Sequence, residues 1–106
     1  AMLCDPDVRG QAAAQGGDPA ALLDTYLSLV ARILEDSPAG MATAMHLCRG
    51  NFRSRWMASG GYEPVAERLF NTASVDTFLL EYDTERAGDL APLRFVPKGK
   101  RVVLGL

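Results

Sequence analysis

The residues best suited to chemistry are His46 and Cys48. His46 is the only histidine of the chain, and Cys48 is one of its two cysteines. They stand two positions apart at the end of a strand-like apolar run, and residues i and i+2 of a strand point to the same face. The imidazole and the thiolate would therefore project together, as half of a tetrahedral zinc site. The alternative is a core histidine beside an inert buried thiol.

The run that ends in this pair predicts a strand over Met41–Cys48 with two different faces. One face carries Ala42 and Ala44 and then His46 and Cys48. The opposite face is mostly bulky: Met41, Thr43, Met45 and Leu47. A barrel strand whose interior is packed, and whose carboxyl end faces a site, has this pattern.

A third candidate ligand, Glu81, lies in the next predicted strand, Val75–Asp83. It is an acid within an apolar run, again near the carboxyl end of its strand. An inward carboxylate must be paired, protonated or bound to a metal. The spacing favours an ion pair with a neighbouring arginine, such as Arg86 or Arg49, and leaves metal binding as the alternative.

The segment 49–61 reads as a loop that is rich in arginine and glycine. Its three arginines, Arg49, Arg53 and Arg55, stand among aromatic residues and could bind carboxylates or phosphates. The alternative is a solvated loop with local ion pairs. The loop leaves the strand at the His46 end, where α/β folds place their ligands.

The composition of the chain excludes several classes of protein. Its 106 residues suffice for one domain, and its hydrophobic share of 48% and charged share of 23% are those of a globular protein. A net charge of −2 does not support a nucleic-acid or anionic-membrane surface. No apolar run approaches the length of a membrane span, and no signal peptide is visible. With two cysteines and no disulfide framework, we expect a cytoplasmic protein in which Cys4 and Cys48 stay reduced.

The rest of the chain alternates helices with strands. Asp5-Pro6 and Asp18-Pro19 are helix starts, and helices are predicted over 6–15, from residue 19 to the Ser37-Pro38 break, and over 62–71. The second helix has a wide apolar stripe, which we expect to pack on a sheet rather than to bind a partner. One turn of helix is expected around residues 90–95.

This alternation predicts an α/β fold with parallel strands and right-handed crossovers. Ala1–Cys4 reads as the tail of a strand, and Arg101–Leu106 reads as a further strand. Complete domains rarely begin and end on buried strands. We therefore expect residues 1–106 to be a piece of a larger fold with about three to four parallel strands.

Several motifs resemble the cobalamin-independent methionine synthase family, in particular short bacterial proteins similar to its catalytic C-terminal half. The resemblance covers essentially the whole chain. The motifs that carry it are His46-Leu47-Cys48-Arg49-Gly50-Asn51-Phe52-Arg53-Ser54-Arg55-Trp56, Gly60-Gly61-Tyr62, Phe78-Leu79-Leu80-Glu81-Tyr82-Asp83 and Phe95-Val96-Pro97-Lys98-Gly99-Lys100.

The resemblance implies a (β/α)₈ TIM barrel, of which residues 1–106 would be a fragment of a single methyltransferase domain. It also implies a zinc ion, Zn²⁺, held by His46, Cys48 and Glu81 together with a second cysteine outside these residues. The implied reaction moves a methyl group from 5-methyltetrahydrofolate to the thiol of homocysteine. We infer that Arg49, Arg53 and Arg55 contact the glutamates of the folate.

Three readings of function remain open at this point. The first is the zinc-dependent methyltransferase of the methionine synthase type, inactive as a fragment. The second keeps the zinc site and moves alkyl groups to another thiol, such as coenzyme M. The third is a non-catalytic αβ scaffold or binding module in which His46 and Cys48 belong to the core. Because a partial barrel has open strand edges, we also expect the 106-residue chain to self-associate.

Overall fold

The computed structural model describes residues 1–106, and its centre is a parallel sheet of three strands. These are β1 (Ala44–Leu47), β4 (Thr77–Glu81) and β5 (Arg101–Gly105), in the order β1-β4-β5. Both pairings are parallel, with His46 beside Leu79 and Leu79 beside Val103. The predicted α/β fold with parallel crossovers is confirmed.

Three α-helices accompany the sheet, and two of them begin at the predicted caps. They are α1 (Pro6–Ala14), α2 (Pro19–Glu35) and α3 (Glu63–Thr72). The Asp5 carboxylate accepts hydrogen bonds from the first backbone N–H groups of α1, and Asp18 does the same for α2. A free carboxylate before a proline satisfies amides that the helix itself cannot bond, which explains both starts.

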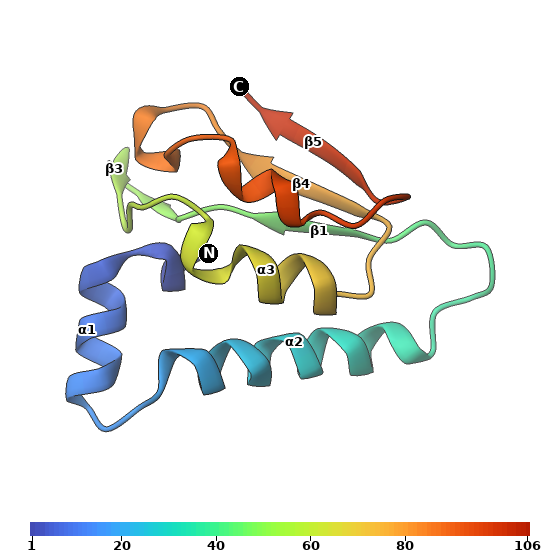
Figure 1. The fold of residues 1–106 in the computed structure, drawn as a ribbon, viewed down its shortest axis with the longest axis horizontal. Coiled ribbons are helices and arrows are strands. Elements are labelled where there is room, and N and C mark those ends of the chain that lie inside the picture. Colours follow the sequence, from blue (N-terminus) through green and yellow to red (C-terminus); the bar gives the residue numbers. More distant parts are fainter.

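The hydrophobic core lies on one side of the sheet, where the helices are (Figure 1). Phe78 and Leu80 of β4 point into it and are fully buried. The ring of Phe78 meets Phe70 of α3 edge to face, with 4.9 Å between ring centroids. Met45 and Leu47 of β1, like alternate residues of β5, pack against the same core. The bulky face predicted for the first strand is therefore its core face.

The other face of the sheet carries no helix (Figure 1). Ala44, His46 and Val103 are exposed there, and 52% of Val103 is accessible to solvent. Parallel sheets are normally covered on both faces, so this surface is unusual. The strands β1 and β5 each have one unpaired edge. Three strands do not close into a barrel, and the barrel stays a prediction.

Helix α2 packs mainly on α3 and α1. Leu27 enters the core, whereas Tyr26 and Ile33 of the same apolar stripe stay exposed. An apolar hollow of about 540 Å³ separates α1 and α2 from β1. The predicted packing of this stripe on the sheet is therefore only partly realised. No helix combines the length and the apolar character that crossing a bilayer requires.

Two segments differ from the sequence prediction. Met2–Cys4 is a short 3₁₀ helix, η1, and not the tail of a strand. Leu3 and Cys4 are buried in the core, whereas Met2 is exposed. The Cys4 N–H bonds to the Ala1 carbonyl. Burial, and not strand pairing, therefore explains why Leu3 and Cys4 are apolar. The segment predicted as a loop contains a hairpin, β2 (Asn51–Phe52) and β3 (Arg55–Trp56). Two further 3₁₀ helices, η2 (Glu85–Ala87) and η3 (Ala91–Phe95), follow β4.

Candidate functional site at the carboxyl end of the sheet

Three of the predicted site residues line one hollow at the carboxyl end of the sheet. His46, Cys48 and Glu81 come together because β1 and β4 run parallel, so both strands end at the same edge. The hollow has a volume of about 530 Å³. The other lining residues are Asn51, Leu79, Leu80, Asp83, Val103, Gly105 and Leu106.

His46 is exposed on the open face of the sheet, and Cys48, just beyond the end of β1, is half-buried. The other cysteine, Cys4, is buried in the core, and burial raises the pKa of its thiol. Both cysteines are free thiols. Because an apolar environment makes a thiol inert, Cys48 is the cysteine with access to a metal or a substrate.

Glu81 is held through both of its carboxylate oxygens. Oε1 pairs with the guanidinium of Arg86, and Oε2 accepts a hydrogen bond of 2.9 Å from the backbone N–H of Arg49. The Arg49 guanidinium lies 3.7 Å from the same Oε2. Burial alone would raise the pKa of Glu81, but these donors outweigh it and hold the pKa below its usual value. The ion pair that the spacing favoured is confirmed, with both arginines.

Arg49 is completely buried and bonded to protein groups. Its Nε donates to the Gly60 carbonyl at 2.6 Å, and Nη2 donates to the Ala87 carbonyl at 3.3 Å. The guanidinium carbon lies over the Tyr62 ring, 4.2 Å from its centroid. The Tyr62 hydroxyl in turn bonds the backbone of β1 and β4. Arg49 therefore joins the ends of two strands to the loops around them.

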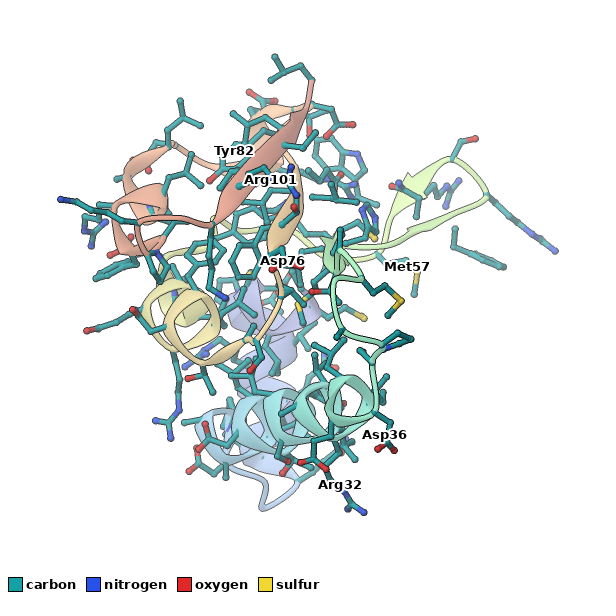
Figure 2. The ribbon with its side chains drawn as sticks, turned by 90° about the vertical axis from the view of Figure 1, so that its right-hand side faces the viewer. Arg32, Asp36, Met57, Asp76, Tyr82 and Arg101 are labelled. Atoms are coloured by element: carbon teal, nitrogen blue, oxygen red, sulfur yellow. The ribbon has the colours of Figure 1, made fainter.

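Arg53 and Arg55 lie apart from Arg49, on the exposed β2–β3 hairpin. The hairpin projects from the body of the molecule beyond Met57 (Figure 2). Its two-residue turn is Arg53-Ser54, with φ angles of 50° and 60°. Both residues lie in the left-handed region, which suits a hairpin turn but is normally filled by Asn and Gly. The structure thus separates the three predicted arginines into one buried group and two solvent-exposed groups.

The donors around the hollow match zinc in kind, since it takes imidazole, thiolate and carboxylate ligands. The structure nevertheless gathers no group of three histidine, cysteine or acidic side chains close enough to hold a metal ion. Glu81 is engaged by Arg86 and Arg49, and a metal would have to displace one of these partners. Unlike Glu81, neither His46 nor Cys48 takes part in an ion pair that a metal would have to break.

Two residues of the hollow, Asn51 and Asp83, were not among the predicted site residues. Asp83 follows Glu81 by two positions, so the same-face rule for strands could have found it. Asn51 is the first residue of β2, a strand of two residues that is too short to show a periodicity. Its side-chain oxygen accepts a hydrogen bond of 3.2 Å from Arg86. The Nε of Arg86 is buried without an acceptor.

The chain is similar to two proteins of Bacillus subtilis (strain 168), the uncharacterized proteins YxjH and YxjG. It is 46% identical to YxjH over 94 residues, which are 88% of this chain and 25% of YxjH. It is 39% identical to YxjG over 97 residues, which are 91% of this chain and 26% of YxjG. The chain thus spans about a quarter of the length of the curated relatives it matches. No family model and no solved structure matches it.

Proposed function

We propose that these residues form part of the site of a zinc-dependent methyltransferase of the methionine synthase type. The observation that carries the proposal is the meeting of His46, Cys48 and Glu81 in one hollow at the carboxyl end of parallel strands. Open α/β sheets and TIM barrels bind their ligands at this end. The uncovered sheet face and the unpaired edges of β1 and β5 are what a partial (β/α)₈ barrel would leave exposed.

In this proposal His46 and Cys48 supply two zinc donors, and Glu81 supplies a third. Zinc, when bound, lowers the pKa of a substrate thiol such as that of homocysteine, so that the nucleophilic thiolate forms at neutral pH. Arg86 and Arg49 keep Glu81 ionised and fix its position at the end of β4. A further donor, and the residues that bind the thiol substrate, would come from outside residues 1–106.

The hairpin is the proposed contact for the methyl donor, a methylated folate. Arg53 and Arg55 are exposed near its turn and free to bind the carboxylates of the folate glutamates. Arg49 is buried and does not reach a ligand at the hairpin, so it can affect folate binding only by holding the hairpin in position. Replacing Arg53 by alanine in the full-length enzyme is expected to raise KM for the folate and to leave kcat nearly unchanged.

The test of the proposal is zinc content after purification without chelator. It should be measured on this chain and on YxjH, with Cys48→Ser or its equivalent in each. A matched control is Cys4→Ala, because Cys4 lies in the core and outside the hollow. About one zinc per one or two chains, lost in Cys48→Ser and kept in Cys4→Ala, supports the proposal. Absence of zinc from both proteins contradicts it.

One observation favours a second candidate, a non-catalytic αβ scaffold. Glu81 is paired with Arg86 and Arg49 as a structural residue would be, and no three metal donors lie together. In this case neither protein binds zinc, and Cys48→Ser changes only stability. Transfer to a different thiol, such as coenzyme M, keeps the zinc site, so turnover with alternative thiols separates that reaction from the first.

A further inference from the structure

The guanidinium of Arg86 holds both arms of the β2–β3 hairpin. Nη1 donates to the carbonyls of Gly50 at 3.3 Å and Ala58 at 3.4 Å, and Nη2 donates to the side chain of Asn51 at 3.2 Å. The Arg86 guanidinium carbon also lies 5.0 Å from the centroid of the Trp56 ring. Gly50 and Asn51 enter the hairpin, whereas Trp56 and Ala58 leave it. One side chain therefore joins the two ends of the segment.

The same guanidinium pairs with Glu81 in the sheet. The Arg86 side chain is 1% exposed and that of Glu81 is 10% exposed, so the pair is shielded from water. Glu81 is fixed at its other oxygen by the backbone N–H of Arg49. The hairpin is thus attached to the end of β4 through Arg86 and the Glu81 carboxylate.

The hairpin needs such an attachment because it has little stability of its own. Its strands have two residues each, and short two-stranded hairpins are at best marginally stable in water. Its turn residues, Arg53 and Ser54, both have positive φ without being glycine, which adds backbone strain. Phe52 and Trp56 are 62% and 53% exposed, so burial contributes little.

We propose that Arg86 is a positioning residue that couples the hairpin to Glu81, so that the orientation of Arg53 and Arg55 depends on the contact between Arg86 and the Glu81 carboxylate. It follows that a ligand that displaces Arg86 from this carboxylate in the hollow releases the hairpin. By reciprocity, a ligand that fixes the hairpin in another position changes the affinity of Glu81 for its own ligand. The coupling requires neither zinc nor methyl transfer and stands apart from the proposed function.

The chain offers a direct probe, because Trp56 is its only tryptophan. Acrylamide quenching of Trp56 fluorescence and hydrogen exchange of the hairpin amides are measured on wild type, Glu81→Gln and Arg86→Lys. Lysine keeps the charge but lacks the planar fork that reaches several acceptors at once. The matched control is Arg94→Lys, since Arg94 also pairs with an acid, Glu63, and lies over an aromatic ring, but is exposed and remote from the hairpin.

We expect the hairpin amides of Glu81→Gln and Arg86→Lys to exchange about tenfold faster than wild type, as loss of one charged hydrogen bond implies. Quenching of Trp56 should rise in both, while β4 amides keep their protection. Arg94→Lys should match wild type. Glu81 and Arg86 act through one contact. The exchange rate of the hairpin amides in the double variant should therefore exceed that of the faster single variant only slightly. Unchanged hairpin exchange in Glu81→Gln, with the fold intact, overturns the coupling.

A second variant tests the coupling in the other direction and avoids the buried pair. Asn51 is exposed, so Asn51→Ala leaves the core untouched. Loss of its bond to Arg86 should shift the carboxyl-carbon NMR signal of Glu81 and speed hairpin exchange. The Asn51→Ala test can be made even if the Glu81→Gln and Arg86→Lys variants fail to fold. A Glu81 signal identical to that of wild type overturns the proposal.

Discussion

The backbone N–H of Arg49 donates to Glu81 Oε2 at 2.9 Å, and the Arg49 guanidinium lies 3.7 Å from the same oxygen. The two residues are 32 positions apart and meet because β1 and β4 end side by side. Arg49 also lies against the Tyr62 ring, whose hydroxyl bonds both strands. The contact therefore joins the proposed ligand Glu81 to the end of β1, where His46 and Cys48 lie.

Arg49→Ala is expected to lower the free energy of unfolding by about 3 kcal/mol, because it removes one partner of a buried ion pair. The control is Arg53→Ala, which alters an exposed hairpin residue and should change stability by less than about 0.5 kcal/mol. Urea unfolding followed by circular dichroism measures both. Equal stabilities of the two variants would show that Arg49 is not a structural residue.

Gly60 has a φ of 113°, and a Cβ added there would lie 2.4 Å from the Cys4 carbonyl oxygen. Gly60→Ala must therefore push η1 away from the segment that precedes α3. The expected loss is at least about 3 kcal/mol. Gly40 has a similar positive φ of 82° with open space around it, so Gly40→Ala should cost only about 1 kcal/mol. Thermal unfolding of Gly60→Ala and Gly40→Ala measures the two losses of stability, and their difference gives the cost of the clash at residue 60.

Asp5 accepts hydrogen bonds at the start of α1 and from the backbone N–H of Ser59 at 2.7 Å. The Ser59 bond is the main cause that holds the pKa of Asp5 below its ordinary value of 3.8. A folded pKa below the unfolded one means that the carboxylate stabilises the fold above pH 3.8. This contribution is lost as the pH falls through the lowered pKa.

Asp5→Ala should therefore lower the free energy of unfolding by about 1–2 kcal/mol at neutral pH. Below about pH 4 the stability of this variant should fall less steeply with pH than that of wild type. Asp18→Ala is the control, because the Asp18 cap bonds only the exposed start of α2. Asp18→Ala should lower the free energy of unfolding at neutral pH by less than Asp5→Ala does. Denaturant unfolding between pH 2 and 7 provides the comparison. A loss of stability on acidification that is as large in Asp5→Ala as in wild type would contradict this account.

The 106-residue chain is expected to self-associate through its open sheet. The edges of β1 and β5 are unpaired, and Val103 and Leu106 are 52% and 92% exposed. Unpaired edges next to apolar surface favour pairing between chains. Light scattering should give a mass above that of the monomer, and Val103→Lys should lower it. A monomer at micromolar concentration would contradict the prediction.

The sequence by itself determined the three α-helices and the three strands of the parallel sheet, but not η1 or the β2–β3 hairpin. Asp5-Pro6 and Asp18-Pro19 predicted the starts of α1 and α2, because capping depends on neighbouring residues alone. Alternation along the first strand predicted which residues of β1 share a face, and the structure showed that the bulky face is the one that meets the core. The same rule placed His46 and Cys48 on one face of the strand, and the position of Glu81 in an apolar run marked it as an acid in need of a partner.

Only the tertiary structure decided what these residues contact. The sequence offered Arg49 and Arg86 as alternative partners of Glu81, and the structure uses both. Strand register brings Arg49 to Glu81 from a distant segment, and η2 turns Arg86 back onto the end of β4. The tertiary structure also buried Arg49 while leaving Arg53 and Arg55 on an exposed hairpin, a difference that spacing within one segment does not encode. Short-range physics fixed the α-helices and the main strands, whereas packing and long-range pairing determined the environment of each charge.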